Sequence, residues 1–305
     1  MPNDSASLRI ALSGSTGFLG RALSEWLAAA GHRVVPITRR AGATSGESIA
    51  WDPARGELAP DALDGIDAVV HLAGENVAQR WTDDVKREIR DSRVKSTTLL
   101  ASTMQAMERP PRVLLSGSAI GIYGDRGDEL LDESSPPGSG FLADVVRVWE
   151  DATNQLDRAD VRVVHLRTGV VLGQHGGALE KMLTPFRLGL GGRIGGGSQI
   201  MSWIALDDWT RAVEFLLHAG QVKGPANLVA PVPVSNADFT HALGHALGRP
   251  TIVSIPETAI HLMFGEMGDA TLLASERVVP TRLLGAGFTF RHETIDDALR
   301  TVLAA

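Results

Sequence analysis

The chain contains no cysteine and only one tyrosine, Tyr123, among its 305 residues. The lack of cysteine excludes disulfide bonds, thiolate metal sites and cysteine nucleophiles. Any reaction that requires a tyrosine side chain must therefore use Tyr123. No apolar run approaches the roughly 18 residues of a membrane-spanning helix. The first residues also lack the basic and apolar segments of a secretory signal, so we expect a cytoplasmic protein.

Positive charge is scarce as well, with 29 basic residues against 36 acidic ones and a net charge of −7. Such a balance does not predispose the chain to bind nucleic acid or an anionic membrane surface. Apolar residues make up 44% of the chain and charged residues 21%, which is typical of a globular protein. We therefore expect a small molecule as the binding partner, and the sequence leaves a homo-oligomer open.

Short apolar runs alternate with helical patterns over the first two thirds of the chain. This alternation predicts an α/β fold with a doubly wound parallel sheet of the Rossmann type. The expected strands are Leu8–Leu12, Val34–Ile37, Ile49–Trp51, Ala68–Leu72, Val113–Ser116, Val161–Leu166 and Ala226–Val229. Helical patterns over Asn236–Leu247, Ala259–Leu273 and Thr294–Leu303 indicate a small, mostly helical C-terminal lobe. We predict an NAD(P)-binding domain over residues 1–230, with a substrate-loop segment at about 171–205, and a lobe over residues 231–305.

A glycine-rich segment of the form GxxGxxG follows the first expected strand and opens a helix, at residues 14–20. Gly14 would allow the sharp turn, Gly17 would let a pyrophosphate approach the backbone, and Gly20 would let helix and strand pack closely. The free N–H groups at the helix start would then bind the anion. The alternative is a strand–helix turn that binds nothing.

The second expected strand ends in two arginines, Arg39 and Arg40. An acidic residue at this place is typical of NAD sites, whereas arginines suit the 2′-phosphate of NADP. We therefore predict NADPH in preference to NADH, against the alternative of two solvated surface arginines. Asp52 follows the third strand. It could accept a hydrogen bond from the adenine amino group, or it could merely begin the turn at Asp52-Pro53.

Several further motifs identify the chain with a known family. HLAGEN follows the fourth strand at residues 71–76, SGSAIGIYG follows the fifth at 116–124, and LRTGVVLG lies at 166–173. Together with RVVP at 277–280 and GFTF at 287–290, they resemble the extended and atypical short-chain dehydrogenases/reductases. The resemblance is greatest to the epimerase-like branch, which is described as nucleoside-diphosphate-sugar epimerase-like. That branch joins an NAD-dependent epimerase/dehydratase domain to a C-terminal domain of unknown function.

The resemblance implies a set of cofactor contacts at the carboxyl ends of the strands. The pyrophosphate would be held by Gly14, Ser15, Thr16, Gly17, Phe18, Leu19 and Gly20, and the 2′-phosphate by Arg39 and Arg40. The ribose and nicotinamide would lie over Leu72, Ala73, Gly74 and Glu75, beside Ser116, Gly117 and Ser118, and bordered by Arg167, Thr168, Gly169 and Val170.

The catalytic pair of this superfamily, a tyrosine followed four residues later by a lysine, is missing. Counting back from Glu150 places Leu142 and Val146 at those positions, and neither can transfer a proton. A free phenol has a pKa of about 10, so it needs such a neighbour to act near neutral pH. Tyr123 lies in a motif that flanks the substrate in extended members, and Gly127 stands four residues beyond it.

Three interpretations of the chemistry remain open. Tyr123 could serve as the acid with Ser118, or Glu75 could do so, or the protein could bind NADPH without turnover. The corresponding functions are an NADP-dependent oxidoreductase or epimerase acting on a small polar substrate, with a sugar nucleotide as one candidate, and a non-catalytic NADPH-binding sensor or scaffold. Tyr123 as a pocket wall, Ser118 as a loop serine and Glu75 as a ligand of cofactor hydroxyls are the alternatives to catalytic roles.

The other polar pairs in the sequence predict no metal site. His241 and His245 are four residues apart on one expected helix, but no third ligand accompanies them. Asp207 and Asp208 are expected to form a structural turn that enters a helix, with Asp208 as a cap. The glycine-rich loop at 189–197, which contains Arg193, could be a mobile lid or a passive loop.

Overall fold

The computed structural model describes residues 7–39 and 46–304. Its centre is an eight-stranded sheet in the order β13-β8-β6-β5-β1-β2-β3-β4. The strands are β1 (Arg9–Ser13), β2 (Arg33–Thr38), β3 (Ile49–Asp52), β4 (Glu57–Leu58), β5 (Ala68–His71), β6 (Val113–Ala119), β8 (Arg162–Thr168) and β13 (Gly224–Leu228). All neighbouring strands are parallel except β4, which runs antiparallel to β3. The predicted doubly wound parallel α/β class is confirmed.

The strand order reverses at β1, which pairs with β2 on one side and with β5 on the other. From β1 the chain first builds outward through β2 and β3, and it then crosses back to build β5, β6, β8 and β13. In open α/β sheets, ligands bind outside the carboxyl ends of the strands at such a reversal. This position holds the glycine-rich segment, because β1 ends at Ser13.

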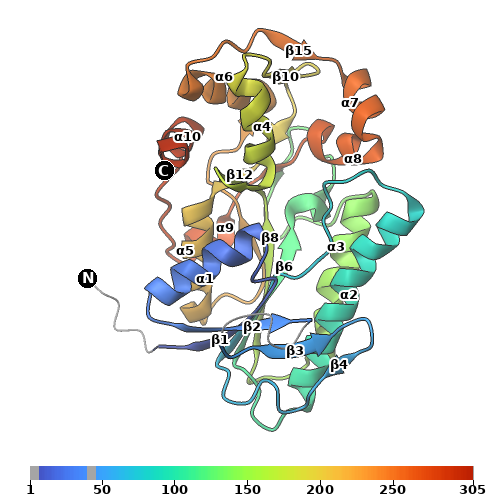
Figure 1. The fold of residues 1–305 in the computed structure, drawn as a ribbon, viewed down its shortest axis with the longest axis vertical. Helices are drawn as coiled ribbons and strands as arrows, with labels where there is room; N and C mark the ends of the chain where they lie inside the picture. Colours follow the sequence, from blue (N-terminus) through green and yellow to red (C-terminus); the bar gives the residue numbers. More distant parts are fainter. Residues whose placement is uncertain (1–6, 40–45, 305) are drawn as a thin grey trace.

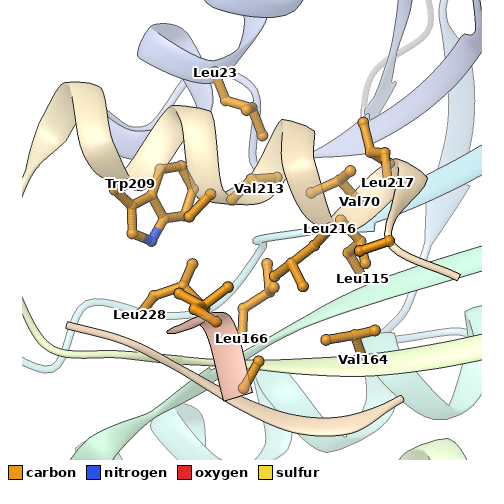
Figure 2. Close-up of a cluster of buried hydrophobic side chains, with 14 of the residues drawn as sticks. Leu23, Val70, Leu115, Val164, Leu166, Trp209, Val213, Leu216, Leu217 and Leu228 are labelled. Carbon is orange, nitrogen blue, oxygen red and sulfur yellow. The ribbon is translucent and has the colours of Figure 1, made fainter. Parts of the chain in front are cut away.

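Helices cover both faces of this sheet (Figure 1), with α1 (Phe18–Ala29) and α5 (Leu206–His218) on one face. The helices α2 (Asp83–Ala106) and α3 (Phe141–Asp151) lie on the other. Alternate residues of a strand point to opposite faces, so Leu12 belongs to the first core and Ala11 to the second. Figure 2 shows Trp209 and Val213 of α5 directed toward strand residues such as Leu166. Full burial of one such aliphatic side chain contributes roughly 1.5–3 kcal/mol to stability.

A separate hydrophobic core lies around α4 (Gly177–Arg187), α6 (Asn236–Leu247) and α10 (Ile295–Ala304). Figure 1 shows α4 and α6 above the large sheet. The members of this core include Leu183, Phe239 and Leu299, so it joins segments on both sides of residue 230. The strand pair of β9 (Val170–Gly173) with β12 (Trp203–Ala205) contributes to this core. A second small pair is formed by β10 (Gly192–Ile194) with β15 (Val253–Ile255). The domain limits proposed from the sequence stay a prediction.

The single helix expected over residues 259–273 is divided into three shorter elements in the structure. They are α7 (Glu257–Phe264), α8 (Glu266–Gly268) and a π-helical turn, η3 (Asp269–Leu273). Gly265 has φ +59°, a left-handed conformation that ends α7. The shorter elements are β7 (Leu130–Leu131), β11 (Ile200–Met201), β14 (Val234–Ser235), β16 (Arg277–Val278), α9 (Thr281–Gly285) and the 3₁₀ turns η1 (Ile120–Tyr123) and η2 (Ala152–Gln155). No helix within residues 7–39 and 46–304 combines the length and the apolar character needed to cross a membrane.

Candidate functional site

The glycine-rich segment turns sharply from β1 into α1. Gly14 has φ +73°, and a Cβ there would lie 2.8 Å from the backbone of Leu72. A Cβ on Gly20 would lie 2.1 Å from the carbonyl oxygen of Gly14, so the helix and the loop touch through their backbones. Gly17 is the N-cap of α1, with no side-chain capping bond and no acidic residue in the first turn. This open helix start fits a pyrophosphate, because its N–H groups and the helix dipole are left for an anion.

A buried histidine joins the loop to the neighbouring strand. His71 is fully buried at the end of β5, and its Nδ1 lies 2.6 Å from the Ser13 hydroxyl. The Ser13 hydroxyl also accepts hydrogen bonds from the backbone of Leu72 and Ala73, at 3.1 and 3.3 Å. The Nε2 atom of His71 lies 3.0 Å from the Ser96 hydroxyl, on α2. Burial, helped by the charge of Arg93, lowers the pKa of His71 to about 3, so the ring is a neutral structural link.

Phe18, the first residue of α1, packs against the segment that joins β9 to α4. A Cβ placed on Gly173, Gly176 or Gly177 would come within 2.2–3.0 Å of the Phe18 ring. These three glycines lie where β9 ends and α4 begins. The ring therefore fills the space that side chains at those positions would take, and it fixes the glycine-rich segment against the base of α4.

The residues expected near the adenosine lie at the ends of β2 and β3. Arg39 is exposed directly after β2, whereas Arg40 lies outside the described residues. The Oδ1 atom of Asp52 accepts hydrogen bonds from the backbone of Ala54 and Arg55, at 3.0 and 3.2 Å. This geometry favours the second interpretation of Asp52, a residue that begins a turn.

The loop after β5 is held from below by α2. Ser92 accepts a hydrogen bond from the Glu75 backbone at 3.0 Å, and Arg93 donates one to the Glu75 carbonyl at 3.0 Å. Gly74 lies directly over the Arg93 side chain, where a Cβ would approach to 3.1 Å. Glu75 itself is exposed, and one of its carboxylate oxygens accepts a hydrogen bond from Gln79 at 3.4 Å, which leaves the other oxygen open to a ligand. Arg93 is a supporting residue whose role is not evident from sequence spacing alone.

Ser118 is held by an ion pair that crosses from α3 to β8. Its hydroxyl donates to Oε1 of Glu150 at 2.6 Å. Arg167 grips the same carboxylate with two hydrogen bonds, Nε to Oε1 and Nη2 to Oε2, both 2.8 Å. Burial alone would raise the pKa of Glu150, but the hydrogen bonds and charge of Arg167 outweigh it and lower that pKa. The carboxylate is therefore ionised and positions the Ser118 hydroxyl.

Tyr123 is fully buried within the same network. Its hydroxyl donates to Oδ1 of Asn227 at 2.8 Å and accepts from Nη1 of Arg167 at 3.0 Å. Burial raises the pKa of the phenol, although Arg167 opposes this shift. The geometry favours a wall residue that helps to position Arg167, and Tyr123 as a proton donor stays a prediction that the arrangement does not favour.

The remaining expected residues lie in or next to β6, β8, β9 and α3. Ser116 and Gly117 are buried in β6, and a Cβ on Gly117 would meet the Trp149 ring at 2.9 Å. Gly169 lies against the carbonyl of Ser202, with only 2.6 Å available to a Cβ, and Val170 begins β9. Leu142 and Val146 present apolar side chains from α3, and Leu142 packs against Gly121. The site thus has no tyrosine–lysine pair, as the sequence indicates.

One partly buried carboxylate was not singled out from the sequence. Glu276 directly precedes β16, and its carbonyl accepts a hydrogen bond from Ser202 at 2.7 Å. Its carboxylate makes no hydrogen bond to any residue that the structure describes. Burial and the carboxylate of Asp125 raise the pKa of Glu276 to about 8. The position before the RVVP motif is the only signal for it in the sequence.

The other polar groups noted in the sequence are exposed on the surface or hydrogen-bonded within the protein. His241 and His245 are both exposed on α6. Among the described residues, Asp207, Asp208 and His292 come close enough to suggest a metal site. The Asp208 carboxylate, however, accepts hydrogen bonds from Arg211 and from the backbone of Arg291 and His292. Arg193 is exposed in β10, the strand within the glycine-rich loop at 189–197. This strand pairs with β15.

The sheet order and the glycine cradle at its reversal define a Rossmann-type protein with the short-chain dehydrogenase/reductase architecture. A family model described as the NAD dependent epimerase/dehydratase family matches residues 10–229. A second, described as a domain of unknown function (DUF1731), matches residues 255–302. The chain belongs to the NAD-dependent epimerase/dehydratase family and carries the DUF1731 domain, which confirms the resemblance seen in the sequence motifs.

Relatives match over almost the full length. An epimerase family protein of Mycobacterium tuberculosis is 44% identical over 96% of this chain and 97% of its own length. The human epimerase family protein SDR39U1 is 37% identical, over 97% of this chain and 100% of its own length.

Solved structures share the fold. The crystal structure of human SDR39U1 (isoform 2) with NADPH superposes with a TM-score of 0.89 at 35% identity, over 97% of this chain and 99% of that one. The UDP-glucose 4-epimerase of Thermus thermophilus in complex with NAD has a TM-score of 0.74. At 18% identity, over 97% of this chain and 98% of that one, it shares the fold alone.

Proposed function

We propose that this protein is a cytoplasmic NADP(H)-dependent oxidoreductase or epimerase that acts on a small polar alcohol or carbonyl compound, with sugar nucleotides among the candidates. The observation that carries this proposal is the Ser118 hydroxyl, held at 2.6 Å by the buried, ionised Glu150 at the carboxyl end of the sheet. A hydroxyl with a fixed orientation and an adjacent base is suited to proton transfer at a substrate oxygen.

The cofactor assignment is supported by the loop, the arginine and a relative. The open start of α1 and the Gly14 cradle suit the pyrophosphate, and the exposed Arg39 suits a 2′-phosphate. Human SDR39U1, the relative with the similar structure, was crystallised with NADPH. When bound, the nicotinamide supplies a hydride donor or acceptor. We assign two polar side chains to face it, the exposed Glu75 and the largely buried Ser118.

Ser118 and Glu150 together transfer the proton of the substrate oxygen. Because the Ser118 hydrogen points to Glu150, the lone pairs of Oγ are left to accept the proton of a substrate alcohol. Arg167 keeps Glu150 ionised and fixes its plane through two hydrogen bonds. In the reverse direction the same hydroxyl donates its proton to a carbonyl oxygen. Leu142 and Val146 keep the adjacent wall apolar.

A second function, an NADPH-binding protein without turnover, is favoured by one observation. Tyr123 is fully buried with its hydroxyl engaged on both sides, so the superfamily's usual phenol is not offered to a ligand. Such a protein would bind the dinucleotide through the same loop and would use the Ser118 network only to stiffen the site.

A turnover screen separates these two functions. The protein with NADPH or NADP⁺ would be mixed with carbonyl compounds, alcohols and nucleotide sugars while the absorbance of the reduced nicotinamide is followed. We expect Ser118→Ala to lower kcat about 100-fold, in the range of general acid–base effects, without changing NADPH affinity. Ser102→Ala is the matched control, because Ser102 is exposed on α2 and bonds only to Leu99. NADPH binding without turnover of any compound would support the second function, and a lack of NADPH binding would overturn both.

A further inference from the structure

His165 lies in the middle of β8, between Ser118 and the opposite edge of the sheet. Only 14% of its side chain is exposed, and its Nδ1 atom is buried without a hydrogen-bond partner. That atom lies 3.7 Å from Oε2 of Glu150. The other oxygen of Glu150 accepts the Ser118 hydroxyl. An ionisable ring therefore contacts the carboxylate that holds the Ser118 proton.

Thr153 determines which nitrogen of His165 carries the hydrogen. The Thr153 hydroxyl donates its single hydrogen to the carbonyl of Glu150 at 2.8 Å. Its oxygen lies 2.9 Å from Nε2 of His165, so Nε2 must be the donor in that contact. The lone pair of Nδ1 then faces Glu150. A proton on Nδ1 would convert this unsatisfied contact into a hydrogen bond, after a movement of roughly 0.5–1 Å.

Burial and the neighbouring charges keep the His165 ring neutral, so it can accept a proton. Burial lowers its pKa, the Glu150 carboxylate raises it, and Arg167 and Asp151 add smaller effects of opposite sign. The net shift is downward, so the ring is neutral near pH 7. The residues paired with His165 in the flanking strands are Ser116 and Pro225, and neither carries a charge.

A cavity of about 900 Å³ reaches His165 from the amino edge of the sheet. Thr153 and His165 both line it, together with Arg162 at the start of β8 and Gly224 at the start of β13. Its rim carries acidic and basic side chains. Because Thr153, whose hydroxyl oxygen contacts Nε2, also lines this cavity, we place the Nε2 side of the ring toward the cavity and the Nδ1 side toward Glu150.

We propose that His165 is a proton-relay residue that connects Ser118, through Glu150, to the water-accessible cavity at the amino edge of the sheet. The inference rests on the proposed function. As a substrate alcohol is oxidised, its O–H bond breaks and the proton passes to Oγ of Ser118. The Ser118 hydrogen moves to Oε1 of Glu150, and the carboxyl group, which is then neutral, turns about its Cγ–Cδ bond so that this oxygen faces His165. The same proton passes to Nδ1 of His165, and the Nε2 hydrogen passes by way of the Thr153 hydroxyl to water. The electron pair of the substrate C–H bond leaves as hydride to the oxidised nicotinamide, so charge and atoms balance.

The relay assigns to His165 the exchange with solvent that the missing tyrosine–lysine pair would otherwise provide. Glu150 stays ionised at rest because of Arg167 and carries the proton only in passing. Arg167 and Thr153 are positioning residues, since each acts by fixing a neighbour. Reduction of a carbonyl runs the same path in the opposite direction.

His165→Gln is the direct test, because glutamine retains a donor for Thr153 but cannot change its protonation. We expect kcat to fall about 10-fold or more, with a larger solvent deuterium isotope effect and with NADPH affinity within about 2-fold of the parent protein. His245→Gln is the control, since His245 is exposed on α6, away from the network. A parent protein that turns over substrate, together with a His165→Gln variant whose kcat is unchanged, would overturn the relay and leave the proposed function intact.

A second measurement does not require turnover. Nitrogen-15 NMR of the NADPH-bound protein, with His165→Gln for assignment, reports the protonation of each ring nitrogen. We expect a neutral ring near pH 7 with its hydrogen on Nε2, and a change in the Nδ1 shift in Ser118→Ala. A ring that is charged at pH 7, or that carries its hydrogen on Nδ1, would make His165 a fixed partner of Glu150 and refute the relay. If no substrate is turned over, the proposed function fails and the relay fails with it; if substrate is turned over, the protonation of the ring decides the relay separately.

Discussion

The Tyr123 hydroxyl donates a hydrogen bond to Oδ1 of Asn227 at 2.8 Å and accepts one from Arg167 at 3.0 Å. Both hydrogen-bond functions of the phenol are thus engaged by buried partners on β13 and β8. Tyr123 is therefore part of the support for Arg167, and through it for Glu150 and Ser118.

Tyr123→Phe should lower stability more than it lowers activity. The variant leaves Asn227 and Arg167 each without one buried partner, which costs about 1–3 kcal/mol. Urea unfolding measures this loss, and NADPH titration and turnover should stay within a few-fold of the parent protein. A loss of turnover by two orders of magnitude at unchanged stability would instead make Tyr123 the proton donor.

Gly20→Ala should abolish dinucleotide binding. The new Cβ would lie 2.1 Å from the Gly14 carbonyl oxygen, and because that atom is backbone, the glycine-rich segment itself must move. We expect NADPH affinity to fall at least about 100-fold, a loss of about 2.7 kcal/mol, as measured by calorimetric titration. Gly220→Ala is the matched control, since nothing lies within 4 Å of its Cβ position. Normal NADPH binding by Gly20→Ala would show that the loop does not hold the cofactor.

Arg39→Ala should distinguish NADPH from NADH. Removing a charged donor from a phosphate weakens binding by about 1.5–3 kcal/mol, which corresponds to roughly 10- to 100-fold in affinity. NADH lacks the 2′-phosphate, so its affinity should not change. Arg187→Ala, at an exposed position in α4, controls for the loss of one surface charge. An equal loss for both dinucleotides would contradict the assignment of Arg39 to the 2′-phosphate.

Because of Glu276, the free energy of unfolding should decrease as the pH rises. Burial and Asp125 raise its folded pKa to about 8, from a usual value of 4.5. Between these two values the folded protein retains the proton and the unfolded chain loses it. This group's contribution to the free energy of unfolding is therefore complete below the lower value and falls as pH rises through the window, by at most about 1.4 kcal/mol per pH unit.

Glu276→Gln should remove this dependence of stability on pH. The variant should therefore become more stable relative to the parent protein as the pH rises through the window. Urea unfolding on both sides of the window measures the difference. Glu293→Gln, at an exposed position, should retain the parental slope. Parallel stability profiles for the parent protein and Glu276→Gln would show that Glu276 ionises at its ordinary pKa.

The sequence predicts the sheet better than the site. The strands of the parallel sheet are apolar runs, because a parallel sheet is buried on both faces, and each expected run coincides with an observed strand. The helix expected over residues 259–273 is interrupted because Gly265 adopts φ +59°, a choice that helical periodicity does not reveal. The family motifs indicate the positions of Ser118 and Tyr123 in the chain. They do not reveal which atoms of those residues are engaged.

The supporting network illustrates why. Glu150 and Arg167 are 17 residues apart on a helix and a strand, and their pairing depends on how α3 packs on β8. Tyr123 and Asn227 are 104 residues apart, so nothing local in the sequence indicates that the phenol is engaged. Long-range polar contacts of this kind become visible only when the packing of the elements is known.

The contact between Phe18 and the three glycines at the base of α4 has an evolutionary consequence. Gly177 has φ +70°, a conformation that favours glycine whatever stands at position 18. Gly173 has no such backbone constraint and is limited mainly by the bulk of the aromatic ring, with the Leu206 side chain also nearby. Relatives with a smaller residue at position 18 should therefore tolerate alanine at position 173 while retaining glycine at position 177. The glycine-rich segment and the turn between β9 and α4 are then expected to have changed together during divergence, as a covarying pair of segments.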